Sequence, residues 1–300
     1  MAARLLLMCP GQGAQSPAMF DLARADPRAA AFLAACGAEG MDGASLFSNA
    51  LAQPAIVAAT LATWMALGEF TPAPALVAGY SIGELAAYGV AGALDPVEAV
   101  ALARRRAALM DACRADGEGQ AMLAASGIAS ARIETILARF GFHAAILTGD
   151  DSLVAGGPAA AREPLAAALA AEGAHATMLP VEIASHTPYM RAAVAPFESL
   201  LRASSMRDPD IPVLSGIAAA PLDAAGAAIT HLARQLAEPI RWKDCMDAAA
   251  EAGVTVALEL GPGAALSRML QSRHSHIACR SVSEFRSLEG VRSWLARHAD

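Results

Sequence analysis

The stretch Gly79-Tyr80-Ser81-Ile82-Gly83-Glu84 lies between two apolar runs and is the strongest local pattern in this sequence. The apolar run Ala75–Ala78 precedes it and Leu85–Ala87 follows it, which predicts a buried strand, a tight turn and a helix. The pattern Gly-x-Ser-x-Gly is that of a nucleophile elbow, in which two glycines let strand and helix pack closely around a strained turn. We therefore predict that the hydroxyl of Ser81 stands clear of the sheet edge as a nucleophile.

The same five-residue pattern also arises by chance in a chain rich in alanine and glycine, so an ordinary structural turn is the alternative. The expected helix start behind Ser81 offers unpaired N–H groups, which would stabilise negative charge on a substrate oxygen. Because the strand and helix context is right, we favour the catalytic interpretation.

The composition is that of a globular protein with a substantial core, since 55% of the 300 residues are apolar and 17% are charged. A net charge of −7 argues against nucleic acid as the general partner. Five scattered cysteines without a C-x-x-C pair favour a reducing cytoplasm over a disulfide framework or a zinc ribbon. We predict a cytoplasmic enzyme with no metal site and no resident cofactor.

The longest apolar stretch, Leu51–Leu67, raises the question of a membrane span. It contains Gln53, Pro54 and two threonines, and at about 17 residues it is short for a span. We expect a buried helix begun by Pro54, and no membrane partner.

The order of elements predicts an α/β fold in two parts. Apolar runs alternate with helical segments over most of the chain, starting with a strand at Leu5–Met8, which favours a mostly parallel sheet covered on both faces. From Gln120 onward, shorter elements follow in the order β-α-β-β-α-β, the split ferredoxin-like pattern. We predict a large α/β-hydrolase-like subdomain formed by residues 1–119 and 190–300, and a small inserted ferredoxin-like subdomain formed by residues 120–189.

Two further segments carry polar groups of interest. The turn Pro10–Gln15 is rich in glycine but lacks the Lys-Ser/Thr of a phosphate-binding loop, so a loop that presents N–H groups to an active site fits better. A helix begun at Asp95-Pro96 runs through three consecutive arginines, Arg104–Arg106. Successive helical residues point about 100° apart, so at least one arginine must face the protein interior. For each one taken singly, a solvated helix end is the alternative.

A serine nucleophile needs a base, and imidazole is the usual one. Of the seven histidines, His186 stands out because it lies between an expected strand end and a helix begun by Pro188. A capping or core role is the alternative for His186. His274 and His276 lack further ligands at metal-binding spacing and are expected at the surface.

The chain resembles the malonyl-CoA:acyl carrier protein transacylase family over nearly its whole length. The resemblance rests on seven short motifs in the order seen in that family, each weak alone: Gly11-Gln12-Gly13-Ala14-Gln15, Gln53-Pro54-Ala55, Gly79 to Glu84, Arg106 with Met110, Ser185-His186 with Met190, Arg234-Gln235-Leu236 and Glu259-Leu260-Gly261-Pro262-Gly263.

The resemblance implies a role for each of five positions. Ser81 would attack a malonyl thioester, and His186 would take and return the proton. The main-chain carbonyl of Gln235 would orient the histidine in place of a carboxylate. The backbone N–H groups of Gln12 and Ile82 would form the oxyanion hole.

The resemblance also implies a substrate clamp and a partner. Arg106 would bind the free malonyl carboxylate through paired hydrogen bonds, a task that suits a planar guanidinium. The substrate would be malonyl-CoA, and the acceptor an acyl carrier protein bearing a phosphopantetheine-type thiol arm.

Within the family, the chain looks most like the malonyl transferase subunit of bacterial malonate decarboxylase, whose carrier bears a dephospho-CoA-derived arm. Tyr80 stands where most members have histidine, and Ser281–Phe285 supports the same comparison. Gly149–Ser152 replaces a family asparagine motif, which leaves that asparagine without a clear counterpart. Other subunits of that enzyme would then be partners. The alternatives are a malonyl transacylase of fatty acid or polyketide synthesis, a serine hydrolase or thioesterase, and a non-catalytic docking module.

Overall fold

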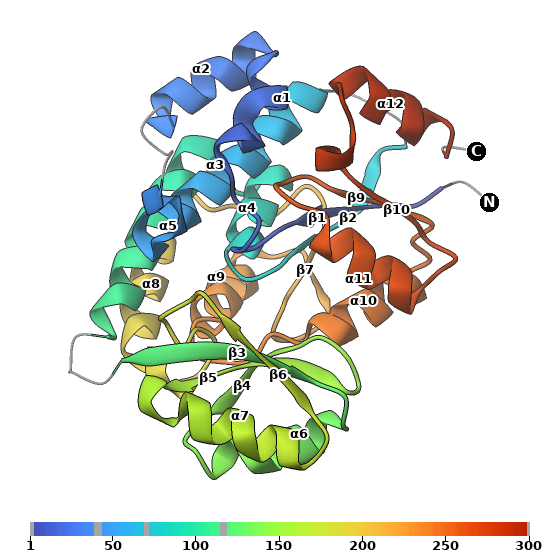
Figure 1. Ribbon diagram of the computed structural model, residues 1–300. Coiled ribbons are helices and arrows are strands. Elements are labelled where there is room, and N and C mark those ends of the chain that lie inside the picture. The colour runs from blue at the N-terminus through green and yellow to red at the C-terminus, as the bar shows by residue number, and fades with distance from the viewer. Residues whose placement is uncertain (1–2, 39–43, 69–71, 115–118, 299–300) are drawn as a thin grey trace.

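The computed structural model describes residues 3–38, 44–68, 72–114 and 119–298. It contains a six-stranded and a four-stranded sheet, each covered by its own helices (Figure 1). The six-stranded sheet has the order β10-β9-β1-β2-β7-β8, and all its neighbouring strands are parallel except the edge pair β7 and β8. Its strands are β1 (Leu5–Cys9), β2 (Pro74–Gly79), β7 (Val213–Leu214), β8 (Pro221–Leu222), β9 (Val256–Glu259) and β10 (Ala278–Ser281).

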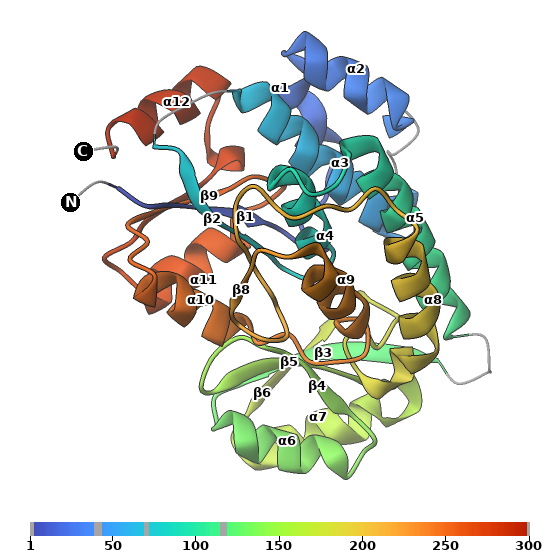
Figure 2. The same cartoon turned by 180° about the vertical axis from the view of Figure 1, so that it is seen from behind.

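Helices cover both faces of this sheet, which confirms the expected layering. Leu5 and Leu7 of β1 belong to a core shared with the helices of one face, whereas Leu6 and Met8 belong to a second core that α10 and α11 cover. Figure 2 shows α10 and α11 between the large sheet and the small one. The helices around the large sheet are α1 (Asp21–Arg24), α2 (Pro27–Ala35), α3 (Asn49–Leu67), α4 (Ile82–Val90), α5 (Pro96–Ala112), α8 (Arg191–Arg202), α9 (Ala225–Arg234), α10 (Trp242–Glu251), α11 (Ala265–Arg273) and α12 (Leu288–Ala296).

The start of α3 differs from the sequence prediction. The helix begins at Asn49, after an extended Ser48, so Pro54 lies inside its second turn and does not begin it. Proline has no N–H to donate, so one hydrogen bond of the helix is missing there. The helix continues because its apolar residues are buried on nearly all sides. It is long and apolar enough to cross a membrane, but 78% of that window is buried inside the protein, which confirms the expected core helix.

The small sheet is antiparallel with the order β4-β5-β3-β6, the arrangement of a ferredoxin-like unit. Its helices pack on one side around their own apolar core, and the predicted β-α-β-β-α-β order is confirmed. The exact boundaries at residues 120 and 189 stay a prediction. The elements are β3 (Gln120–Ser126), α6 (Ser130–Ala138), β4 (His143–Leu147), β5 (Ser152–Pro158), α7 (Arg162–Ala171) and β6 (His175–Leu179). Short 3₁₀ turns of the described residues are η1 (Pro17–Phe20), η3 (Ala44–Phe47), η4 (Ala159–Ala161), η5 (Pro188–Met190) and η6 (Val282–Glu284).

The two sheets are joined by main-chain hydrogen bonds as well as by side chains. Ile240 donates to the carbonyl of Ala145 at 2.9 Å and accepts from Leu147 at 2.8 Å, so the segment before α10 pairs with β4. Lys243 and Asp150 form an ion pair across the same junction, at 3.2 Å. These contacts fix the small sheet beside the end of the large one.

Candidate active site

Ser81 lies in a strained turn between β2 and α4. Its φ is 58°, a left-handed conformation that residues other than glycine seldom adopt. A Cβ on Gly79 would overlap the backbone of Glu84, and one on Gly83 would overlap the carbonyl oxygen of Cys9. Only glycine at both positions therefore allows α4 to pack this closely on β1 and β2. The turn leaves Ser81 partly exposed, as the elbow motif predicts.

His186 is brought to Ser81 from 105 residues further along the chain. The ring Nε2 lies 2.7 Å from Ser81 Oγ, and the ring Nδ1 lies 2.6 Å from the main-chain oxygen of Gln235. A carbonyl oxygen only accepts, so Nδ1 carries the proton and donates it to this bond. In a neutral imidazole Nε2 is then unprotonated and accepts from the Ser81 hydroxyl.

The environment of His186 favours its neutral form. The residue is 1% exposed, and its backbone N–H donates to the carbonyl of Leu236 at 2.8 Å. Burial, and secondarily the positive charge of Arg106, lower the pKa of His186 to about 3. The imidazole is therefore uncharged at neutral pH and can accept a proton.

The glycine-rich loop after β1 lies against the nucleophile. A Cβ on Gly11 would be 2.8 Å from the carbonyl oxygen of Tyr80 and 3.6 Å from Cβ of Ser81. Gln12 is the next residue of the chain after Gly11. Ile82 is the first residue of α4, so its N–H has no acceptor within the helix. The structure thus brings the two predicted oxyanion segments to Ser81, while their role stays a prediction.

Arg106 is the arginine that turns inward, as the helical spacing predicts. It is 2% exposed, whereas Arg104 and Arg105 are exposed on the same helix, α5. The helix begins where the predicted cap, Asp95, accepts from the backbone N–H groups of Val97 and Glu98. Because the helix begins at this cap, the helical repeat places the Arg106 side chain on the face that points into the protein.

Two neutral glutamines hold the guanidinium of Arg106. Its Nη1 donates to Gln53 Oε1 at 2.7 Å, and its Nη2 donates to Gln235 Oε1 at 3.4 Å. Among the described residues, no carboxylate lies within ion-pair distance of this guanidinium. Burial lowers the pKa of Arg106 to about 10, so the group stays charged at neutral pH. A buried cation held by neutral groups is suited to receive an anion.

The sequence did not show how Arg106 is held. Gln53 donates to Asn49 Oδ1 at 2.6 Å, and the two residues lie one turn apart on α3. The available signal was a pair of amides, four residues apart, in a helix whose other polar residues are two threonines. No sequence pattern indicated that the side chain of Gln235 contacts Arg106. The resemblance to the family implied a role only for the main-chain carbonyl of this residue.

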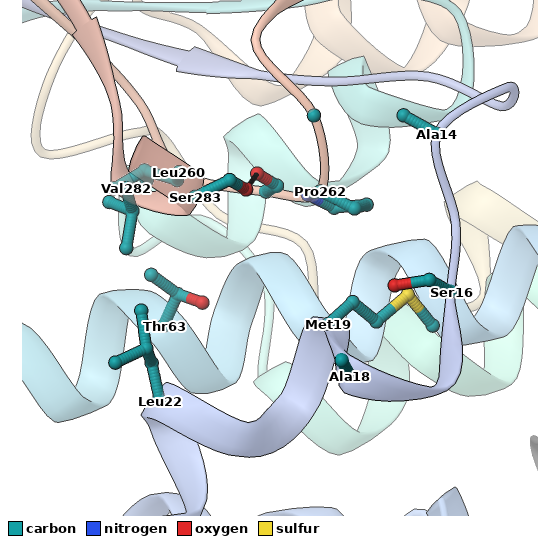
Figure 3. A pocket seen from close by; sticks show the side chains of 12 residues that line it. Ala14, Ser16, Ala18, Met19, Leu22, Thr63, Leu260, Pro262, Val282 and Ser283 are labelled. Carbon is teal, nitrogen blue, oxygen red and sulfur yellow. Dashed lines mark hydrogen bonds between the residues drawn. The ribbon is translucent and has the colours of Figure 1, made fainter. Parts of the chain in front are cut away.

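Two cavities lie near these residues. A cavity of about 550 Å³ lies where the start of α3 and the end of α5 face β3 and the segment after β6, and Gln12 is the predicted site residue on its wall. A second cavity of about 260 Å³ lies on the other side of the glycine-rich loop, with Ala14 and Pro262 on its walls (Figure 3). None of the predicted site residues lines the second cavity.

Tyr80 packs into the body of the protein beside the nucleophile. Its ring meets that of Trp242 edge to face, with centroids 5.3 Å apart, and burial raises the pKa of its hydroxyl. This contact gives Tyr80 a packing role. Its value as a marker of one branch of the family stays a prediction.

The protein thus combines an α/β fold with a nucleophile elbow, a serine paired with histidine, and a buried arginine beside them. The model of the acyl transferase domain family matches residues 6–288, and the chain belongs to this family. A malonyl CoA-acyl carrier protein transacylase from Mycobacterium bovis is 32% identical over 292 residues, which cover 93% of this chain and 96% of the relative.

Solved structures agree with this assignment. A malonyl-CoA:acyl carrier protein transacylase from Xanthomonas oryzae has a TM-score of 0.91 and 29% identity, with all of both chains covered. A malonyl transacylase solved in complex with a holo type II polyketide acyl carrier protein has a TM-score of 0.90 and 26% identity, over 97% of this chain and 99% of that one. The expected fold class is thereby confirmed.

Proposed function

We propose that this protein transfers a malonyl group from malonyl-CoA to the thiol of an acyl carrier protein through an acyl-enzyme on Ser81. The observation that carries the proposal is the pairing of Ser81 and His186 at 2.7 Å close to a buried guanidinium without an ion-pair partner among the described residues. A general hydrolase needs only the first of these two features.

The transfer has two similar halves. Ser81 Oγ attacks the thioester carbonyl while its proton moves to His186 Nε2, and the tetrahedral intermediate collapses with loss of the CoA thiolate, which takes that proton. The carrier thiol then gives its proton to His186 and attacks the acyl group, and Ser81 recovers its proton as it leaves. The carbonyl of Gln235 holds the imidazole in the required tautomer throughout.

Two further parts of the site support this chemistry. The N–H groups of Gln12 and Ile82 would stabilise the oxyanion, and the close approach of the Gly11 backbone to the elbow turn supports this assignment. Arg106 would bind the free carboxylate of the malonyl group with the donors that the two glutamines leave unused. The acyl group would thus be selected by its charge.

The cavity lined by Gln12 would give the thiol arm a route towards Ser81. It is about 550 Å³ in volume and lies where α3 and α5 face β3 and the segment after β6. A related transacylase has been solved with its holo carrier protein, which supports a carrier as the partner here. A transfer assay tests the proposal: purified protein, malonyl-CoA and a holo carrier should give malonyl carrier faster than free malonate. Hydrolysis that is equally fast without the carrier would favour the thioesterase alternative.

We further propose that the carrier is that of malonate decarboxylase, in which this chain would act with the other subunits. Tyr80 in place of the usual histidine, together with Ser281–Phe285, supports this branch. Carriers that bear either a phosphopantetheine arm or the longer dephospho-CoA-derived arm should be offered in competition. Preference for the longer arm is expected, whereas preference for phosphopantetheine would point to fatty acid or polyketide synthesis.

A further inference from the structure

Glu84 is a buried carboxyl group that has no role in the proposed transfer chemistry. It lies in the first turn of α4, three residues after Ser81, and is 1% exposed. Its Oε2 accepts from the backbone N–H of Gly216 at 3.0 Å and from Nε2 of Gln235. Its Oε1 is buried and has no hydrogen-bond partner among the described residues. A buried carboxylate with an unsatisfied oxygen is costly unless a nearby charge compensates it.

One amide group connects Glu84 to Arg106. The side chain of Gln235 donates through Nε2 to Glu84 and accepts through Oε1 from Nη2 of Arg106. A guanidinium only donates and a carboxylate only accepts, so the two partners fix the orientation of this amide. Glu84 and Arg106 are therefore opposite charges held on either side of one side chain, and each stabilises the charged form of the other.

We propose that Glu84 balances the charge of Arg106 while the site is empty, and takes up a proton when the malonyl carboxylate binds Arg106. This inference rests on the proposed function, because it needs an anionic acyl group at Arg106. The physical reason is that two buried carboxylates would then share one guanidinium, and the like charges disfavour keeping both ionised. The proton comes from solvent and adds to a Glu84 oxygen, which turns the carboxylate into a neutral carboxylic acid.

The surroundings of Glu84 make it the group that titrates near neutral pH. Burial raises its pKa to about 7. Tyr88 on α4 and Cys245 on α10 also interact with its charge, but burial raises the pKa of both, which keeps them neutral. His186 also interacts with the charge of Arg106, but its pKa is lowered to about 3, chiefly by burial, so its ring is neutral as well.

The direction of the pH effect follows from linkage. If bound malonyl-CoA raises the pKa of Glu84, binding is accompanied by proton uptake. This uptake is largest at pH values between the pKa of Glu84 in the empty site and its pKa in the occupied site. The affinity for malonyl-CoA should therefore fall as the pH rises above about 7, by at most tenfold for each pH unit. Acetyl-CoA carries the same CoA but no free carboxylate, so its affinity should not show this dependence on pH.

Calorimetry on the full-length Ser81→Ala variant tests the proposal without turnover. Malonyl-CoA and acetyl-CoA are each titrated at about pH 7.5 in two buffers that differ in ionisation enthalpy, which yields the number of protons bound. We expect malonyl-CoA to take up roughly half a proton more than acetyl-CoA. We expect Glu84→Gln, added to Ser81→Ala, to remove that difference while malonyl-CoA still binds.

Equal proton uptake with the two ligands would overturn the proposal, and this comparison needs no variant of Glu84. An excess that persists in the Glu84→Gln protein would also overturn it, because another group would then be the acceptor. Tight malonyl-CoA binding without excess uptake counts against Glu84 alone. Failure of malonyl-CoA to bind any better than acetyl-CoA would instead contradict the carboxylate clamp at Arg106, and with it the proposed function.

Discussion

The Nδ1 of His186 donates to the main-chain oxygen of Gln235 at 2.6 Å, while the side chain of the same glutamine contacts Arg106 and Glu84. One residue thus serves the proposed base through its backbone and the proposed clamp through its side chain. The first contact survives any substitution that preserves the backbone, whereas the second does not. The two functions can therefore be separated experimentally.

Replacing Gln235 by alanine should weaken malonyl selection and leave the nucleophile intact. Arg106 loses one of its two supporting acceptors, so the ratio of kcat/KM for malonyl-CoA over acetyl-CoA should fall by about tenfold. The rate at which a small neutral fluorophosphonate labels Ser81 should change by less than about threefold, since the His186 contact is made by the main chain. Loss of fluorophosphonate labelling in a folded variant would contradict this separation.

Replacing Arg106 by alanine should abolish the preference for a charged acyl group. Two charge-assisted hydrogen bonds to a carboxylate correspond to about 3 kcal/mol, so the same selectivity ratio should fall by about 100-fold. Arg105→Ala is the matched control, because it removes an exposed guanidinium from the same helix. If Arg106→Ala kept the malonyl preference, the guanidinium would not be the clamp.

The low pKa of His186 predicts an unusual acid limb in the pH profile. The value of kcat/KM reports the free enzyme, in which the pKa of His186 lies at about 3, so the base stays unprotonated well below pH 7. We expect kcat/KM for malonyl-CoA at about pH 5 to stay within twofold of its value at pH 7. An imidazole at its ordinary pKa would lose about 25-fold over that interval. Circular dichroism at both pH values checks that the protein remains folded.

The packing of the elbow predicts a large effect from one methyl group. A Cβ added at Gly83 would overlap the carbonyl oxygen of Cys9, which is held within the sheet, so Gly83→Ala should lower the free energy of unfolding by about 3 kcal/mol or more. Gly226→Ala is the control, because a Cβ there meets no atom within 4 Å, and it should stabilise α9 by about 0.5 kcal/mol. Urea unfolding of both variants compares them, and similar stabilities would contradict the close packing described here.

Much of the fold could be predicted from local patterns in the sequence. The apolar run before Gly79 and the cap at Asp95 define a strand and a helix by themselves, and the antiparallel unit follows from the order of its short elements. The start of α3 was predicted wrongly, since proline favours a first turn but tertiary burial allowed it in the second. The short strand β8 had no signal of its own, because it is only two residues long.

The site was predictable where chemistry requires a residue type, and less so where it depends on packing. Ser81 could be located from its motif, and the phase of α5 required that one arginine turn inward. The approach of His186 to Ser81 is set by contacts between segments 105 residues apart, which no local pattern encodes. The support of Arg106 by Gln53 likewise depends on how α3 packs against α5.

Mass spectrometry of the intact protein after brief incubation with malonyl-CoA shows whether Ser81 becomes acylated. An acyl-enzyme on Ser81 predicts one malonyl group per wild-type chain, located on Ser81 by peptide mapping, transferred to a holo carrier on its addition, and absent from Ser81→Ala. A wild-type protein that gains no acyl group, or an equal gain by Ser81→Ala, would contradict it.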